Sequence, residues 1–369
     1  MDMWDDMNQN GEWDSGETSN KYVIAVTGHN MVMTNKLAYK NFDRNYNELP
    51  DWWEAQTGLS SVTNGGAYVD TDGDGLINLY EYCYGFNPLV SDAMNTLPAV
   101  ATRTINMMLA GAEEPAVSLP KFINYLSNGQ NGIFVTNAHF WARGLDTSCV
   151  SMWNSFDGKK RGGTLISARH IIFAHHFPLR PNDKVIFLGT DSTVHTNIIL
   201  STQRVAGTDI RIAALQTEVD TTIIHPVKIL PPDYADYIGI GQYLPVLRFD
   251  QDERFLVSEI SQEIPFFASV QSESEESIMM TSPSSELWRS FYSPIRDLDS
   301  GNPFFLLAGN DIVLLGTLHW RWNGYSSCSG PFVTTYAQEI QDAMDTLAPG
   351  YSLSYLDCSS YGRLQEAPR

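Results

Sequence analysis

The sequence predicts a mainly β protein: a β-barrel or sandwich, closed by a C-terminal helix and preceded by a loop-rich module. Three observations predict it. From about Gly132, short runs rich in Val, Ile, Thr and Phe are broken by turn residues about every 8–12 positions, a spacing typical of barrels and sandwiches. Residues 1–95 combine Asp, Asn and Gly with aromatic residues and show little periodicity. Residues 336–347 have helical composition and period.

The individual elements follow in chain order. Residues 96–128 are expected to form a helical connector, with helices over 97–108 and 121–126. Strands are expected at 185–189, 197–202, 210–215 and 312–318, and a hairpin joins 304–307 to 312–315 through residues 308–311. The predicted domains are 1–95, 96–128 and 129–350, followed by a tail at 351–369.

Charge and composition exclude several classes of protein. The 369 residues include 43 Asp and Glu against 23 Lys and Arg, a formal net charge of −20. Such an acidic balance argues against a nucleic-acid partner. No apolar run approaches the roughly 20 residues of a membrane span. The four cysteines follow no metal-ligand spacing and could form up to two bridges, whose pairing the sequence leaves open: Cys83, Cys149, Cys328 and Cys358.

Twelve-residue loops rich in side-chain oxygens recur near the N-terminus. Calcium takes six to eight oxygen ligands, and such a loop supplies them at positions 1, 3, 5, 7, 9 and 12, with Gly at position 6 for the turn. The loop at 70–81 fills every position, with candidate ligands Asp70, Asp72, Asp74, the Leu76 carbonyl, Asn78 and Glu81. The loop at 6–17 does so as well, with candidate ligands Asp6, Asn8, Asn10, Glu12, Asp14 and Glu17.

A third loop, at 43–54, keeps the oxygen spacing but lacks the glycine. Its candidate ligands are Asp43, Asn45, Asn47, Asp51 and Glu54. Glu48 stands where Gly belongs, and a non-Gly residue in the left-handed conformation costs about 1 kcal/mol, so this site is expected to be weaker or distorted. Ordinary Asp- and Asn-rich turns are the alternative interpretation. Three matches so close together favour calcium binding.

The stretch at 49–54 and the Asp-Gly-Asp-Gly loop after it resemble the calcium-binding repeats of bacterial extracellular proteins, akin to EF-hand loops and thrombospondin type 3 repeats. The resemblance implies calcium as a structural cofactor. It also implies a secreted or cell-surface location, where calcium is abundant enough for weak loops. Because the first residues lack the basic and apolar regions of a signal peptide, we expect either that the natural N-terminus is missing or that the chain is intracellular.

The second half of the chain holds histidine, aspartate and serine in a pattern typical of covalent catalysis. Acyl transfer at neutral pH needs a weak nucleophile activated by a base that a carboxylate orients. The blocks are 163–177, which ends in Ala-His-His-Phe, then 208–213, which holds Asp209, and 297–303, which holds Ser300. The chain order His, Asp, Ser excludes the subtilisin order and that of the α/β-hydrolases, whose Gly-x-Ser-x-Gly elbow is also absent.

Residues 130–350 resemble the trypsin-like serine peptidases. Gly-Thr-Leu-Ile-Ser with the later Ala-x-His, Asp-Ile-x-Ile-Ala, and Asp-Ser-Gly-Asn-Pro match the three blocks of that family, with Asn302 in place of the usual Gly. The resemblance implies two six-stranded antiparallel β-barrels with a C-terminal helix. It also implies Ser300 as nucleophile, Asp209 as the orienting carboxylate and His176 as general base, with His175 as the alternative base.

The oxyanion hole and the activation mechanism are where the sequence departs from that family. The resemblance assigns the oxyanion hole to the backbone N–H groups of Leu298 and Ser300, but Leu298 replaces a family glycine. Phe177 and Arg296 stand where two family cysteines belong. No Arg/Lys-Ile-Val-Gly-Gly activation site is present, so Asp299 is not expected to be held by a freed amino terminus, and no cleavage of a precursor is expected.

The sequence thus predicts a serine endopeptidase that cleaves protein or peptide substrates through an acyl-enzyme and needs no catalytic cofactor. Pro294 stands at the family's base-of-pocket position, where an Asp would select Lys or Arg, so that preference is not expected. Arg321 is expected to narrow the pocket. The alternative is an inactive adhesion or scaffold protein that keeps the peptidase fold and binds calcium. A zinc enzyme built on His175 and His176 is disfavoured, because adjacent residues of a strand face opposite ways.

Overall fold

The protein, described here as a computed structural model, divides into two compact units: Met1–Met94 with Leu364–Arg369, and Asn95–Arg363. The described residues are 2–4, 19–21, 47, 49–59, 66–67, 69–72, 78, 81–82, 87–90, 96–110, 112–125, 134–151, 160–239, 244–267, 274–322 and 327–364. Among them, no helix is both long and apolar enough to cross a bilayer.

The described part of the first unit holds one strand pair and one helix. β1 (Asp2–Trp4) pairs antiparallel with β2 (Ser19–Lys21), so the two strands flank the predicted loop at 6–17, which lies outside the described residues. α2 (Asp51–Thr57) follows Pro50 and ends at Gly58, whose φ of +84° is left-handed. Glycine adopts that conformation without steric cost, so it ends the helix cleanly.

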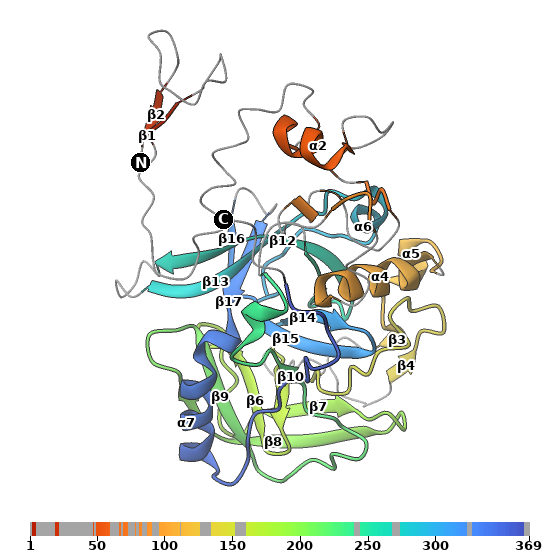
Figure 1. Ribbon diagram of the computed structural model, residues 1–369. Helices are drawn as coiled ribbons and strands as arrows, with labels where there is room; N and C mark the ends of the chain where they lie inside the picture. The colour runs from red at the N-terminus through yellow and green to blue at the C-terminus, as the bar shows by residue number, and fades with distance from the viewer. Residues whose placement is uncertain are drawn as a thin grey trace. The chain divides into compact units, whose positions relative to one another are not determined.

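A five-stranded antiparallel sheet forms the first half of the larger unit (Figure 1). Its order is β5 (Thr164–Ser167), β6 (His170–Ala174), β9 (Ile210–Leu215), β8 (Val194–Arg204), β7 (Lys184–Leu188). α7 (Ala337–Leu347) packs along β8 and β9. The strands expected at 185–189, 197–202 and 210–215 and the C-terminal helix are confirmed.

An eight-stranded sheet forms the second half. Its order is β10 (Lys228–Ile229), β15 (Asp311–Thr317), β14 (Pro303–Ala308), β11 (Pro245–Phe249), β12 (Phe255–Phe267), β13 (Ser274–Thr281), β17 (Ser327–Pro331), β16 (Trp320–Trp322). Neighbouring strands are antiparallel except β10 and β15. The expected hairpin is confirmed as β14–β15, with a tighter turn than predicted, because Ala308 already pairs with Asp311.

The strand counts differ from the six and six that the sequence analysis expected. In the second sheet, β10 and β16 are short edge strands of two and three residues that extend a set of six. The first sheet has five strands, and an isolated bridge joins Val150 to Thr164 of its edge strand β5. The described chain is therefore mainly β, with antiparallel sheets and a C-terminal helix, consistent with a chymotrypsin-like fold.

Apolar side chains of both sheets join in one buried cluster that includes Phe173, Ile212, Leu247 and Phe305. Two glycines let β15 and β17 approach each other closely. A Cβ at Gly316 would lie 2.3 Å from the Pro331 carbonyl oxygen, and one at Gly330 would lie 2.1 Å from that of Thr317. No side chain fits at either position.

The connector is only partly helical. α4 (Leu97–Ala110) confirms the first expected helix, and α5 (Pro115–Ser118) follows it. The second expected helix, at 121–126, is wrong: β3 (Phe122–Tyr125) pairs there with β4 (Phe134–Thr136). Its sequence, Phe-Ile-Asn-Tyr, is rich in aromatic and β-branched residues. Whether so short a segment forms a strand depends on whether a partner strand lies beside it.

The remaining described helices are short: η3 (Tyr234–Asp236), α6 (Glu286–Ser290) and η5 (Val333–Tyr336). Cys149, Cys328 and Cys358 are buried free thiols, so no bridge joins any of them. Cys83 lies outside the described residues.

Candidate active site

The three candidate catalytic residues come from the ends of neighbouring elements. His176 follows β6 and Asp209 directly precedes β9, and these strands pair with Ala174 opposite Ile210. That register puts both residues side by side at the same end of these two inner strands of the five-stranded sheet. Ser300 comes from the loop before β14 in the eight-stranded sheet, so the site lies between the two sheets.

The serine loop approaches the histidine strand at Gly301. Its φ is +84°, and a Cβ there would lie 3.4 Å from the backbone nitrogen of Ala174. The Gly301 N–H donates to the Leu318 carbonyl at 2.8 Å. Glycine therefore allows both the turn and the close approach.

The side chains of His176, Asp209 and Ser300 form one chain of hydrogen bonds. Ser300 Oγ lies 2.8 Å from His176 Nε2, and His176 Nδ1 lies 2.7 Å from Asp209 Oδ2. The other carboxylate oxygen accepts the His176 backbone N–H at 2.8 Å. With Nδ1 donating to the carboxylate, Nε2 is free to accept the serine proton. The His176 side chain is 44% exposed and that of Asp209 only 16%, so the base is accessible while the carboxylate is shielded.

His175 has different partners. Its Nδ1 accepts from Arg211 Nε at 3.1 Å and from Nη2 of the same guanidinium at 2.9 Å. Burial, and then the charge of Arg211, lower the pKa of His175. The two histidine rings therefore do not share a ligand site, and the geometry favours His176 as the base.

The two candidate oxyanion donors lie in the turn that carries the nucleophile. Leu298 adopts a left-handed φ of +77°, the conformation that the missing glycine would adopt without cost. Within the described part of the chain, neither the Leu298 N–H nor the Ser300 N–H donates to another residue. Both are therefore available to a developing oxyanion.

Asp299, next to the nucleophile, is fully buried and has an internal counter-charge. Arg248 Nη1 lies 3.7 Å from its Oδ2, and both side chains are at most 1% exposed. Its carboxylate also accepts the backbone N–H of Gln251 at 3.0 Å and of Arg296 at 2.7 Å. Burial raises the pKa of Asp299, while Arg248 acts in the opposite direction. Arg248 thus places a positive charge beside the Asp299 carboxylate. The sequence analysis had already led us to expect that no freed amino terminus provides this charge.

The residues expected to shape specificity are only partly described. Pro294 is exposed, and the Trp320 side chain is 49% exposed. The side chain of Arg321 lies outside the described part. His319, by contrast, is buried and directed at the carboxylates behind the triad.

Sequence reasoning missed Arg248, Glu275 and His319. Arg248 interrupts an apolar strand, Pro-Val-Leu-Arg-Phe, and a buried charge in such a run was the available signal. Glu275 lies in an acidic stretch that resembles a solvated surface segment, so nothing local distinguishes it.

The candidate calcium ligands are described in part, all within the first unit. Asn47 Nδ2 donates to Glu54 Oε1 at 2.6 Å, which joins positions 5 and 12 of the loop at 43–54. α2 begins at Asp51, position 9 of that loop. Asn78 and Glu81, positions 9 and 12 of the loop at 70–81, are fully buried, while Asp70 is exposed.

The ring of Trp53, in the loop at 43–54, lies beside that of Tyr82, the residue that follows the loop at 70–81, with the ring centroids 5.5 Å apart. Among the described residues, no group of three or more His, Cys, Asp or Glu side chains could hold a metal ion. The other candidate ligands, Asp43, Asn45, Asp74, Leu76 and those at 6–17, lie outside the described residues.

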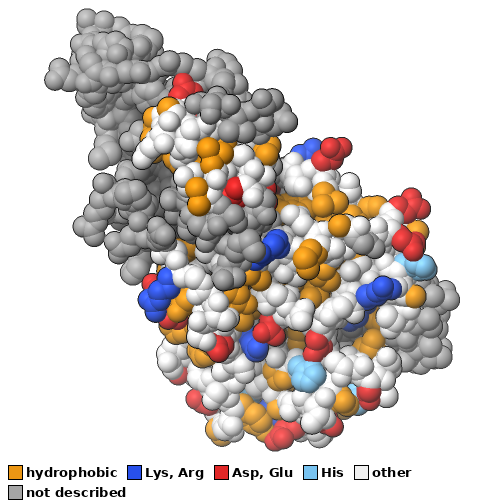
Figure 2. Space-filling view, turned by 45° about the vertical axis from the view of Figure 1, so that its right-hand side comes forward, with side chains coloured by type: hydrophobic (Ala, Val, Ile, Leu, Met, Phe, Trp, Pro, Cys, Tyr) orange, Lys and Arg blue, Asp and Glu red, His pale blue; other side chains and the backbone are white. Residues whose placement is uncertain are grey.

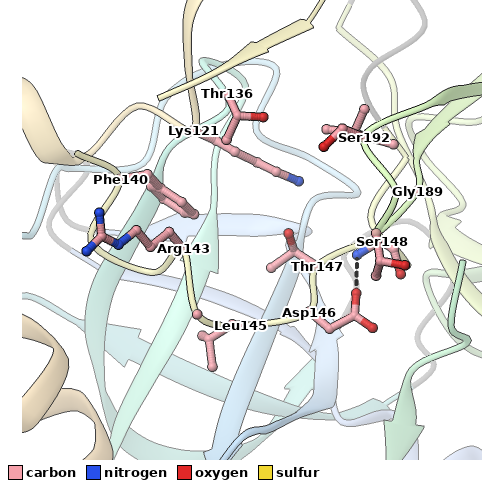
Figure 3. A pocket seen from close by; sticks show the side chains of 13 residues that line it. Lys121, Thr136, Phe140, Arg143, Leu145, Asp146, Thr147, Ser148, Gly189 and Ser192 are labelled. Atoms are coloured by element: carbon pink, nitrogen blue, oxygen red, sulfur yellow. Dashed lines mark hydrogen bonds between the residues drawn. The ribbon is translucent and has the colours of Figure 1, made fainter. Parts of the chain in front are cut away.

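A pocket of about 340 Å³ lies apart from the triad (Figure 3). The segment at 136–148 and the turn after β7 line it, and no triad residue does. Lys121 is 6% exposed, and its amine points into the open space. Burial lowers the pKa of Lys121, against the opposing charge of Glu253. The pocket is therefore a separate feature of the larger unit.

Acidic and basic side chains are interspersed on the face drawn in Figure 2, and its described residues form no continuous basic area.

Comparison with known proteins gives only remote similarity. No protein-family profile matches the chain, and no curated protein matches it. Among solved structures, human heparin binding protein matches with 15% identity and a TM-score of 0.40 over 56% of this chain and 95% of its own. Two engineered variants of that protein match with 14% and 13% identity and a TM-score of 0.41 each, over 56% of this chain and 94% and 95% of theirs. Likeness at this level says nothing about activity.

Proposed function

We propose that the larger unit is a serine endopeptidase that hydrolyses peptide bonds of protein or peptide substrates. The observation that carries the proposal is the hydrogen-bond chain from Ser300 through His176 to Asp209, with distances of 2.8 and 2.7 Å. Three polar residues from three separate blocks of sequence meet in the geometry that nucleophilic catalysis needs.

The reaction follows from the donors and acceptors. Ser300 Oγ attacks the substrate carbonyl carbon while its proton passes to His176 Nε2. Asp209 holds the ring in the required tautomer and stabilises the imidazolium that forms. The N–H groups of Leu298 and Ser300 donate to the carbonyl oxygen as it gains charge. His176 then returns the proton to the departing amine, which leaves an acyl-enzyme. Water, activated by the same histidine, releases the acid.

The buried contact between Arg248 and Asp299 supports activity without prior cleavage of the chain. In this proposal an internal arginine, rather than a newly formed amino terminus, neutralises the carboxylate beside the nucleophile. The alternative is a catalytically inactive adhesion or scaffold protein of the same fold, and only a test of Ser300 separates the two.

That test is labelling by a fluorophosphonate probe, with digestion of a peptide library, for wild type and Ser300→Ala. We expect the wild type to be labelled at Ser300 and to cleave peptides, and the variant to do neither, with a deficit of about 10⁴-fold or more. Thermal unfolding of both proteins should coincide. Equal cleavage by the two proteins would overturn the assignment, and no labelling of a folded wild type would favour the scaffold alternative.

We also propose that the first unit binds calcium as a structural cofactor and that the protein works outside the cell or on its surface. Support comes from the position 5 to position 12 contact between Asn47 and Glu54, and from the buried side chains of Asn78 and Glu81. In this proposal the loop oxygens hold the ion, and calcium offsets their clustered negative charge and orders the unit. It takes no part in peptide hydrolysis.

A further inference from the structure

A second, buried carboxylate lies directly behind the triad. Glu275, on β13, is 3% exposed, and three donors converge on its two oxygens. The backbone N–H of Asp209 donates to Oε2, while the Ser277 hydroxyl at 3.2 Å and His319 Nδ1 at 3.1 Å share Oε1. Because β13 belongs to the eight-stranded sheet and Asp209 directly precedes β9 of the five-stranded sheet, the contact of Glu275 with Asp209 links the two sheets at the candidate active site.

His319 occupies the space between the two carboxylates. Its Nδ1 lies 3.9 Å from Asp209 Oδ2, in addition to its closer contact with Glu275. On the other side of the ring, Nε2 lies 3.1 Å from Ser329 Oγ, and the His319 backbone N–H donates to the Ser329 carbonyl at 2.9 Å. A ring that donates from Nδ1 and accepts at Nε2 satisfies both partners as the neutral tautomer.

These contacts join the two histidines in one continuous series. Ser329 donates to His319, His319 donates to Glu275, and Glu275 accepts the backbone N–H of Asp209. The side chain of Asp209 then orients His176, which faces Ser300. Buried polar groups that are all satisfied in this way hold one another in a single geometry.

We propose that Glu275 and His319 are positioning residues of the active site, which fix the backbone and carboxylate of Asp209 and, through it, the imidazole of His176. The inference rests on the proposed peptidase function. The two oxygens of the glutamate accept all three donors, whereas a glutamine in its place would turn its NH₂ toward at least one of them. Both side chains are buried and act through Asp209, so their loss should lower kcat much more than it changes KM.

The test compares Glu275→Gln with Glu276→Gln, since Glu276 is the exposed neighbour on the same strand. A second pair compares His319→Leu with His319→Gln, whose amide can still donate to Glu275 and accept from Ser329. Two readouts are measured: kcat and KM on a peptide substrate, and, by proton NMR, the exchange rate of the His176 Nδ1 proton in the free protein.

We expect Glu275→Gln and His319→Leu to lower kcat by about 10- to 100-fold with KM within about twofold, as small misplacements of catalytic groups do. The Nδ1 proton should exchange at least about tenfold faster in both. Glu276→Gln should match wild type, and His319→Gln should recover part of the loss. If Glu275→Gln does not fold, the comparison of His319→Leu with His319→Gln still tests the positioning role.

The two proposals fail in different ways. A folded wild type that neither cleaves peptides nor labels at Ser300, yet loses protection of the Nδ1 proton in Glu275→Gln, overturns the peptidase function and keeps the positioning role. A wild type that is active, with kcat and proton exchange unchanged in Glu275→Gln and His319→Leu, overturns the positioning role and keeps the function.

Discussion

Replacing Arg248 by methionine should both destabilise the protein and slow its reaction with an active-site probe. Methionine keeps much of the buried aliphatic volume but leaves Asp299, which is fully buried, without its counter-charge. At the 3.7 Å between Nη1 and Oδ2, and with an effective dielectric constant of about 20, the lost attraction is about 4.5 kcal/mol. That agrees with the roughly 3–5 kcal/mol measured when one partner of a buried pair is removed.

The loss should show in two assays. The free energy of unfolding of such a unit is about 5–15 kcal/mol, so Arg248→Met should stay folded at 25 °C. Its thermal unfolding midpoint should be about 10 °C lower than that of the wild type. The turn that holds Asp299 also carries the N–H groups of Leu298 and Ser300. Because loss of one oxyanion donor costs about 10²- to 10³-fold, we expect fluorophosphonate labelling of Ser300 to slow by about 10²-fold.

The double variant Arg248→Met/Asp299→Asn separates the two effects. Removing the orphaned charge should recover about half or more of the lost stability, since a neutral amide no longer needs a counter-charge. Labelling should stay slow, because an amide cannot accept both the Gln251 and the Arg296 N–H groups. An Arg248→Met variant with an unchanged midpoint and labelling rate would refute the role of the pair.

Three further predictions concern other parts of the molecule. His176→Ala should lose peptide cleavage by about 10⁴-fold while His175→Ala keeps most of it, in kinetics measured side by side; the reverse result would exchange their roles. Glu259→Gln should stabilise the protein at pH 8 by about 3 kcal/mol and much less at pH 5, in urea titrations. Burial raises the pKa of Glu259 from its ordinary 4.5 to about 7, so the folded state holds a proton that the unfolded state has lost, and stability falls as pH rises from 4.5 to 7. Equal effects at both pH values would contradict this account. A calcium chelator should make residues 1–95 cleavable in limited proteolysis while Ser300 remains reactive. The reason is that a calcium site filled at 100 times its Kd adds about 2.7 kcal/mol to stability. If residues 1–95 stay fully protected from proteolysis in the chelator, the calcium proposal is wrong.

The strongest sequence signals came from local patterns whose period or spacing has a direct structural cause. The apolar strands at 184–188 and 210–215, the β14–β15 hairpin and the helix at 337–347 follow from alternation, turn residues and helical period. The segment at 122–125 was misassigned to a helix because four residues of suitable composition form a strand only when a partner, here 134–136, lies beside them.

For the candidate site, the sequence by itself determined which residue types were present and in what order: His, Asp and Ser in three blocks, with oxygen-rich loops before them. The sequence left His175 open as an alternative base. In the tertiary structure Arg211 contacts the ring of His175, whereas the ring of His176 lies between Asp209 and Ser300. The partners of buried charges were equally beyond the sequence. Arg248 lies 51 residues before Asp299, and Glu275 lies 66 residues after Asp209, so no local pattern links them. A buried ionised group is stable only beside a group that pairs with it. The packing of the two sheets determines which residue lies there.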